Sequence, residues 1–180
     1  MSDEYYNIVL IPDNIFARKA VSFAQEFFLD FQDGYCLSDV VFPHITLGQF
    51  KSNDRHILTN IREKLLDVSL SVVIQFKHMY IRRDVLGKKS YLWIGLEVQK
   101  TEDLSQVQAE VHKILNQSHL LPLNRSLENF WPHMTFARIN EQSLFPPFCF
   151  PAEVIDFVGS DWKIEVGYSD CYGQFLGDKK

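Results

Sequence analysis

A chain of 180 residues is long enough for one compact domain with a sizeable hydrophobic core and short for two independent ones. Its composition, 46% hydrophobic and 23% charged, is typical of a soluble globular protein, and no apolar run approaches the ~20 residues that span a bilayer. The net charge of −5 gives no overall positive excess, so we expect no binding of a long nucleic-acid duplex.

The start of the chain and its cysteines indicate a compartment. Met1 is followed by polar residues rather than by an apolar segment, so the sequence predicts no signal peptide. Cys36, Cys149 and Cys171 are an odd number without metal-type spacing, which fits free thiols in a reducing compartment better than a disulfide framework. We therefore expect a cytoplasmic protein, and we expect it to be a monomer.

The first half of the chain predicts a strand, a helix and another strand. Residues 5–11 form an apolar run that predicts a strand. Asp13 or Asn14 can cap the helix that follows, and its apolar residues recur every three to four positions until Gly34 ends it. The strand after this helix carries the first copy of a repeated motif.

The second half repeats this order. Residues 91–98 predict a strand, and Thr101 can cap a helix whose apolar positions extend to Leu115. A strand with the second copy of the motif follows. The two strand–helix–strand units have nearly the same length, which indicates an architectural repeat rather than a short-period solenoid.

Further elements are predicted between and after these units. We expect a helix over 52–68, a strand over 70–82, a turn around Gly87, and a closing hairpin of strands 150–158 and 163–172 that turns at 159–161.

No linker or low-complexity tract divides the chain. We expect an α+β fold in a single domain, 1–180, with two pseudo-symmetric lobes of roughly 1–90 and 91–180 and strands interleaved between them. Each lobe would be a small, mostly antiparallel sheet with helices outside.

The repeated motif is the tetrapeptide Pro43-His44-Ile45-Thr46, which recurs as Pro132-His133-Met134-Thr135. Side chains i and i+2 of a strand point to the same face, so each copy presents one imidazole and one hydroxyl to the same space. With six histidines and four threonines in the chain, two His-x-Thr pairs would arise by chance in about 1 of 150 sequences. The proline before each histidine makes chance a still poorer explanation.

Two histidines and two threonines in one cleft are suited to moving protons around a phosphate. Histidine titrates near pH ~6.5, so one imidazole can take a proton from water while the other gives one to a leaving oxygen. We predict that His44 and His133 are this acid and base, in an order that the sequence does not decide. Thr46 and Thr135 would hold the phosphate oxygens, and neither a metal nor a cofactor is needed.

Other chemistries lack their signatures. A zinc site on His44 and His133 is the main chemical rival, but zinc normally has three or four ligands, and HExxH, CxxC and His-x-His groups are absent from the sequence. A Gly-x-Ser-x-Gly elbow and a glycine-rich phosphate loop are also absent. The alternative from another class is a non-catalytic nucleotide or RNA-end binding module. The matched acid/base pair weighs against it.

Strand parity selects aromatic candidates for the cleft. Trp131 shares a face with the second motif, Trp93 lies on the presumed cleft side of its strand, and Tyr5 is placed similarly. Each could stack on a base or could fill the core between the lobes.

The same parity places Gly48 and Ala137 beside the two His/Thr pairs, where they would leave room for a ligand. It turns Arg138 away from His133 unless the strand bulges.

Basic residues cluster at the predicted turn before Trp93. Arg82, Arg83, Lys88 and Lys89 could form a rim that contacts phosphates upstream of the scissile one, and an ordinary solvated turn is the alternative. If the partner is a nucleic acid, the net charge and this cluster predict a small nucleotide or a short RNA end, with a shallow dependence of affinity on salt.

The two motifs, about half a chain apart, resemble those of the 2H phosphoesterase superfamily, which includes bacterial RNA 2′,3′-cyclic phosphodiesterases, also called 2′-5′ RNA ligases. The stretch 132–138 resembles the second family motif, 92–96 the central strand, and 158–160 with the strand after it the closing hairpin. The resemblance extends from about Tyr6 to about Tyr172.

The resemblance implies a bilobal α+β fold with a central cleft, and hydrolysis of 2′,3′-cyclic phosphate or 2′-5′ linked RNA ends or nucleotides. It also implies weak ligase activity, which is the same reaction run backward. A cyclic phosphate on an ADP-ribose-derived metabolite is an alternative substrate that the sequence does not exclude.

Overall fold

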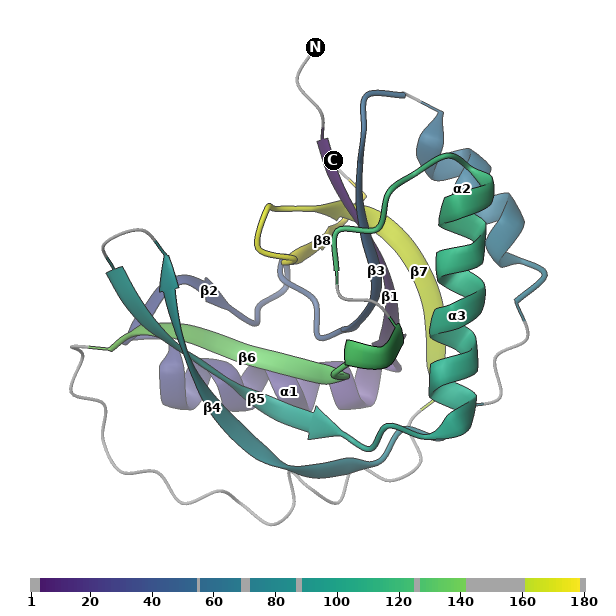
Figure 1. Cartoon of the computed structure of the whole chain (residues 1–180). Coiled ribbons are helices and arrows are strands. Elements are labelled where there is room, and N and C mark those ends of the chain that lie inside the picture. Colours follow the sequence, from purple (N-terminus) through teal and green to yellow (C-terminus); the bar gives the residue numbers. More distant parts are fainter. Residues whose placement is uncertain are drawn as a thin grey trace.

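The computed structural model describes residues 4–54, 56–68, 72–86, 89–124, 127–141 and 161–178. These residues form two four-stranded sheets, three α-helices and the short 3₁₀ helix η1 (Leu127–Asn129). Figure 1 shows how the sheets and the α-helices are arranged in space. The predicted α+β class with two antiparallel sheets is confirmed. No helix within the described ranges is long and apolar enough to cross a membrane.

The first sheet has the strand order β3-β1-β7-β8 and is antiparallel throughout. Its strands are β1 (Glu4–Pro12), β3 (Ile45–Ser52), β7 (Trp162–Ser169) and β8 (Phe175–Gly177). The helices α2 (Ile57–Leu65) and α3 (Glu102–Gln117) contact each other, and they contact β7 and β3 respectively (Figure 1). This sheet carries the first motif on β3.

The second sheet has the order β2-β6-β5-β4 and is also antiparallel. Its strands are β2 (Gln32–Cys36), β4 (Phe76–Leu86), β5 (Lys89–Val98) and β6 (His133–Asn140). Helix α1 (Asn14–Phe28) packs against β6. This sheet carries the second motif on β6, so each sheet supplies one motif strand.

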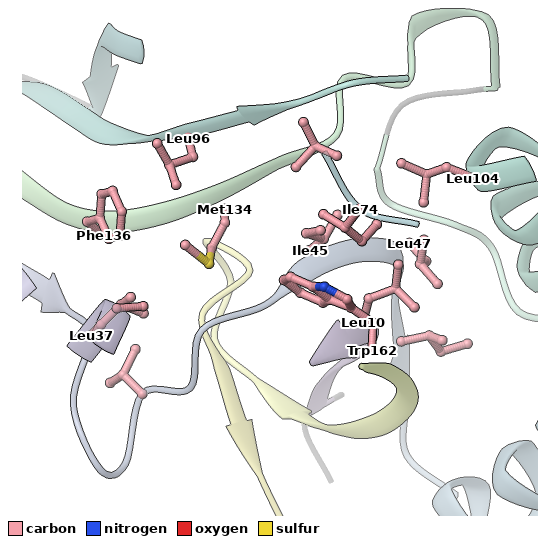
Figure 2. Packing of buried hydrophobic residues seen from close by; sticks show 14 of the residues in the cluster. Leu10, Leu37, Ile45, Leu47, Ile74, Leu96, Leu104, Met134, Phe136 and Trp162 are labelled. Atoms are coloured by element: carbon pink, nitrogen blue, oxygen red, sulfur yellow. The ribbon is translucent and has the colours of Figure 1, made fainter. Parts of the chain in front are cut away.

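One cluster of buried apolar side chains joins the two sheets (Figure 2). The residues between and after the motif positions belong to it: Ile45 and Leu47 on β3 and Met134 and Phe136 on β6 have no exposed surface. Burying a side chain of this size stabilises the fold by about 1.5–3 kcal/mol. A one-residue slip of either strand would expose this set, so the burial also fixes which side chains point away from the core.

The helices begin largely where their caps predict. Asp13 accepts hydrogen bonds from the backbone N–H groups of Ile15 and Phe16 at 2.7 and 2.9 Å, and Thr101 caps α3. Helix α1 ends at Phe28, however, and not at Gly34. Residues 32–36 form the edge strand β2, which the helical spacing concealed because its polar and glycine residues do not alternate with apolar ones.

Other boundaries also move. Helix α2 starts at Ile57 rather than at residue 52 because β3 continues to Ser52. Strand β4 runs from Phe76 to Leu86, so it begins after residues 72–75 and continues beyond residue 82, whereas residues 70 and 71 of the expected strand lie outside the described residues. The second strand of the expected closing hairpin is β7. The first strand, 150–158, and the start of the turn lie outside the described residues.

Each motif strand carries a β-bulge directly after its threonine. On β3, Val9 is opposite Thr46 and Ile8 is opposite Gly48, which leaves Leu47 as the extra residue. On β6, Phe136 is the extra residue between the partners of Gly95 and Ile94. An extra residue reverses the parity of the side chains that follow it. The bulges therefore change which residues beyond the motifs face the cleft.

Candidate active site

A cleft of about 540 Å³ is lined by residues from both sheets. His44, directly before β3, and Thr46 line it from one side, and His133 and Thr135 of β6 line it from the other. The structure thus brings the four motif residues into one space. Ligand sites for small molecules commonly have volumes of roughly 300–1,000 Å³.

The two histidines are held in the same way. The Nδ1–H of His44 donates to the carbonyl oxygen of Phe42 at 2.8 Å, and the Nδ1–H of His133 donates to that of Trp131 at 2.8 Å. In both cases the acceptor lies two residues earlier in the chain. A hydrogen fixed on Nδ1 leaves Nε2 as the nitrogen that can exchange a proton with a ligand.

The surroundings of Nε2 differ at His44. Its Nε2 lies 3.1 Å from the carbonyl oxygen of Gly173, which also accepts a hydrogen bond from Asn7 at 2.7 Å. A neutral imidazole can donate to only one of the two carbonyls that face His44, whereas an imidazolium can donate to both. Burial lowers the pKa of His44 below the ordinary histidine value, and the two carbonyls oppose this lowering in part.

His133 also lies in an environment that favours its neutral form. Burial lowers its pKa to about 4, and the positive charges of His44 and Arg82 add to this effect. The Trp131 carbonyl and the charge of Glu97 act in the opposite direction. His133 is therefore neutral near neutral pH, and the two imidazoles are close enough to influence each other's charge.

Trp131 anchors His133 within the cleft wall. Its indole stacks on the imidazole with ring centroids 4.3 Å apart, and its Nε1–H donates to Glu97 at 2.9 Å. The guanidinium of Arg82 lies 5.1 Å from the centroid of the Trp131 ring. Trp131 lines the cleft as expected from parity, and its ring already stacks on His133 and lies next to the guanidinium of Arg82.

Tyr80 of β4 is part of the site, although the sequence did not predict it. Its hydroxyl lies 2.7 Å from Oγ1 of Thr135, and it lines the cleft together with Arg82 and Asp84 of the same strand. These three residues alternate along β4, so they share one face. The sequence shows this alternation, but it does not show that this face of β4 points to the cleft. That becomes clear only from the pairing of β4 with β5.

The bulges correct the parity argument on β3. Gly48 does not leave room for a ligand, because a Cβ there would lie 3.0–3.1 Å from Val111 and Leu115 of α3. Gln49 lines the cleft instead and donates to the backbone carbonyl of Asp170 at 3.1 Å.

The same correction applies on β6. Ala137 is fully buried in the core rather than open to the cleft. Arg138 lies on the side of Trp93 and Tyr172, two cleft residues, with its guanidinium 5.3 and 5.0 Å from their rings. The bulge that could re-aim Arg138 is therefore present. Its Nε–H donates to the carbonyl of Asp33 at 2.7 Å.

Of the two remaining aromatic candidates, one lines the cleft and the other does not. Trp93 lines the cleft, with Tyr35 edge-on to it at 5.7 Å. Tyr5 does not line it. Tyr5 pairs with Lys51 near the far end of β3 from Thr46, and the Lys51 ammonium lies 4.5 Å from its ring centroid.

The basic candidates also differ in where they lie. Arg82 lines the cleft, whereas Arg83 pairs with Glu141 at 2.9 Å and Lys89 with Asp33 at 3.7 Å. Lys88 lies outside the described residues. Among the described lining residues, Arg82 is the one Lys or Arg and Asp84 is the one carboxylate.

Over the described part of the chain, no group of three or more His, Cys, Asp or Glu side chains is placed to hold a metal ion. His44 and His133 thus have no third ligand of these types beside them among the described residues. A closed structural zinc site needs four ligands, and a catalytic one usually takes three from the protein.

The structure is similar to that of LigT of E. coli in its apo form, with a TM-score of 0.51 and 13% sequence identity over 82% of this chain and 78% of that chain. This likeness confirms the bilobal α+β fold. No protein-family model matches the sequence, and a comparison with curated proteins finds no match.

Proposed function

We propose that the chain is a 2H phosphoesterase that hydrolyses 2′,3′-cyclic phosphates of nucleotides or short RNA ends by metal-independent acid/base catalysis. The observation that carries the proposal is the matched geometry of the two motifs: two imidazoles, each fixed through Nδ1, line one cleft with two threonine hydroxyls. The LigT-like fold adds support.

We assign the base to His133 and the acid to His44. In this mechanism the neutral Nε2 of His133 takes a proton from water as the water oxygen bonds to phosphorus. The Nε2–H of His44 gives a proton to the ribose oxygen as its bond to phosphorus breaks. Thr46 and Thr135 donate hydrogen bonds to the two non-bridging oxygens.

The contacts of the free site support this assignment. The pKa of His133 at about 4 keeps it unprotonated, as a base must be. His44 can donate to both of the carbonyls that face it only as an imidazolium, and these two contacts oppose the lowering of its pKa by burial. For His44 to act on a substrate, the leaving oxygen must replace the carbonyl of Gly173 at Nε2.

The charge of the lining supports a small substrate. With Arg82 as the one basic side chain and Asp84 as the one acidic side chain among the described lining residues, the site suits one phosphodiester group better than a long phosphate chain. Trp93 offers a ring on which a base could stack. A 2′-5′ linked dinucleotide carries the same single phosphodiester and is a second candidate substrate.

Turnover of a 2′,3′-cyclic mononucleotide, measured with EDTA and with added zinc, tests the proposal. We expect the same rate under both conditions. Loss of the rate in EDTA with recovery in zinc would favour the metal rival. Tight binding of the nucleotide without turnover would favour the non-catalytic binding module.

The threonines should contribute through their hydroxyls. We expect Thr46→Val and Thr135→Val to lower kcat/KM about 10–100-fold, because each removes a hydrogen bond to a charged group worth about 1.5–3 kcal/mol. Serine at either position should be much milder because it keeps the hydroxyl. Equal damage from serine and valine would show that packing of the methyl group matters instead.

The pH dependence should follow the two lowered pKa values. A base loses activity as the pH falls through its pKa, and an acid loses activity as the pH rises through its pKa. We therefore expect kcat/KM to fall below about pH 4, where His133 protonates, and to fall again on the alkaline side from a pKa below 6.5, where His44 deprotonates. Circular dichroism at each pH should show that the fold is kept. A kcat/KM that still rises above neutral pH would contradict the assignment.

A further inference from the structure

A row of three paired residues crosses the second sheet beneath the cleft. Tyr80 on β4 is the partner of Gly95 on β5, and Gly95 is the partner of Thr135 on β6. The phenol of Tyr80 extends across the glycine, and its hydroxyl lies 2.7 Å from Oγ1 of Thr135. Two side chains that are not on neighbouring strands are thus hydrogen-bonded through the gap between them.

Gly95 makes this contact possible. A Cβ at position 95 would lie 2.8 Å from the hydroxyl oxygen of Tyr80, 2.1 Å from the carbonyl oxygen of Met134 and 2.8 Å from Cα of Thr135. Any side chain there would occupy the space that the phenol crosses. The bulge at Phe136 begins at the same point, so the glycine and the bulge together set the approach of Thr135 to Tyr80.

Tyr80 has little freedom to move. Its ring meets Trp131 edge-on at 4.8 Å and His133 edge-on at 5.6 Å, and 8% of its surface is exposed. It therefore contacts His133 and Thr135, through which the second motif lines the cleft, and also Trp131 directly before the motif. A side chain with this many fixed neighbours can hold its hydroxyl in one place relative to Thr135 and His133.

Among the described residues, the first motif has no such partner. Thr46 is opposite Val9 on β1, whose side chain has no polar atom. The two threonines therefore differ although their motifs match. The phenol is also the more acidic of the two hydroxyls, which makes it the better donor. If it donates to Thr135, the hydrogen of Thr135 is left for an acceptor in the cleft.

We propose that Tyr80 is a positioning residue: its hydroxyl donates to Oγ1 of Thr135 and so directs the Thr135 hydrogen at one particular non-bridging oxygen of the phosphate. The inference rests on the proposed phosphodiesterase function. If Tyr80 has this role, the second motif binds the phosphate in one defined orientation, whereas the hydroxyl of Thr46 can rotate more freely.

The first test is a double-mutant cycle. Tyr80→Phe keeps the ring and its packing, and we expect it to lower kcat/KM about 10-fold, because the Thr135 hydroxyl is no longer held in the orientation that faces the phosphate. The loss should vanish in a Thr135→Val background and persist in a Thr46→Val background. Tyr91→Phe removes a hydroxyl from a buried tyrosine that does not line the cleft, and it should leave kcat/KM unchanged.

The second test uses the two diastereomers of a 2′,3′-cyclic phosphorothioate, in which sulfur replaces one or the other non-bridging oxygen. Because sulfur is a poor acceptor, Tyr80→Phe should lower kcat/KM for the diastereomer that keeps oxygen opposite Thr135 and should leave the other nearly unchanged. A merely structural role would move both equally.

The outcomes separate the two proposals. If the wild type is active, two results would overturn the role of Tyr80: equal effects on both diastereomers, or full activity of Tyr80→Phe. Either result would leave the phosphodiesterase function unaffected. A wild type inactive on every cyclic phosphate would overturn the function, and this inference with it.

Discussion

Alanine at His44 or at His133 should lower kcat for a 2′,3′-cyclic nucleotide by about 10²–10⁴-fold, the usual contribution of a general acid or base. The reason is geometric: each imidazole is fixed through Nδ1, so each presents Nε2 to the cleft, and the threonines cannot replace its proton transfer. The double variant should lose much less than the product of the two single losses, because the residues act as a unit. Steady-state kinetics on the three variants measures both effects.

His56→Ala is the matched control for these variants. His56 is exposed at the start of α2, and its side chain makes no capping hydrogen bond. It should keep full activity. Thermal unfolding of each variant separates lost chemistry from lost fold. Full activity in either His44→Ala or His133→Ala would contradict the proposed mechanism.

Among single methyl additions to the second sheet, Gly95→Ala should destabilise the fold most. The new Cβ would lie 2.1 Å from a backbone oxygen and 2.8 Å from a backbone carbon, and neither can move without disturbing β6. We expect the free energy of unfolding to fall by about 3 kcal/mol, at the upper end for overpacking. The Tyr80–Thr135 hydrogen bond should break as well, so kcat/KM should fall at temperatures where the variant is still folded. Urea unfolding with parallel kinetics measures both losses.

Gly48→Ala provides the comparison. Its Cβ would meet the side-chain ends of Val111 and Leu115 at 3.0 and 3.1 Å, and these ends can shift by a few tenths of an ångström. We expect a loss of about 1 kcal/mol or less. Equal losses from the two variants would mean that the backbone of β6 is not the obstacle at position 95.

Much of the site could be predicted because it depends on short-range rules. The i, i+2 spacing placed each histidine beside its threonine, and the buried Ile45 and Met134 between them hold the strands in that orientation. The cap at Thr101 and the spacing of apolar residues likewise located α3 within a residue or two.

What could not be predicted depends on partner strands. A bulge is a mismatch between two strands, so nothing in β3 or β6 alone revealed that Gln49 and Arg138 would exchange faces with Gly48 and Ala137. Tyr80 was missed for the same reason. Its role arises from Gly95 on the neighbouring strand, and pairing of this kind is set by tertiary packing.

In the proposed mechanism, two histidines in this cleft open a cyclic phosphate without a metal. Phosphorus NMR of a 2′,3′-cyclic nucleotide, followed in EDTA with the wild type and with the His44→Ala/His133→Ala variant, tests it most directly. We predict that the wild type converts the cyclic resonance into that of a single phosphomonoester and that the double variant leaves it unchanged over the same time. A cyclic resonance that persists with the wild type, or equal conversion by the double variant, would contradict the claim.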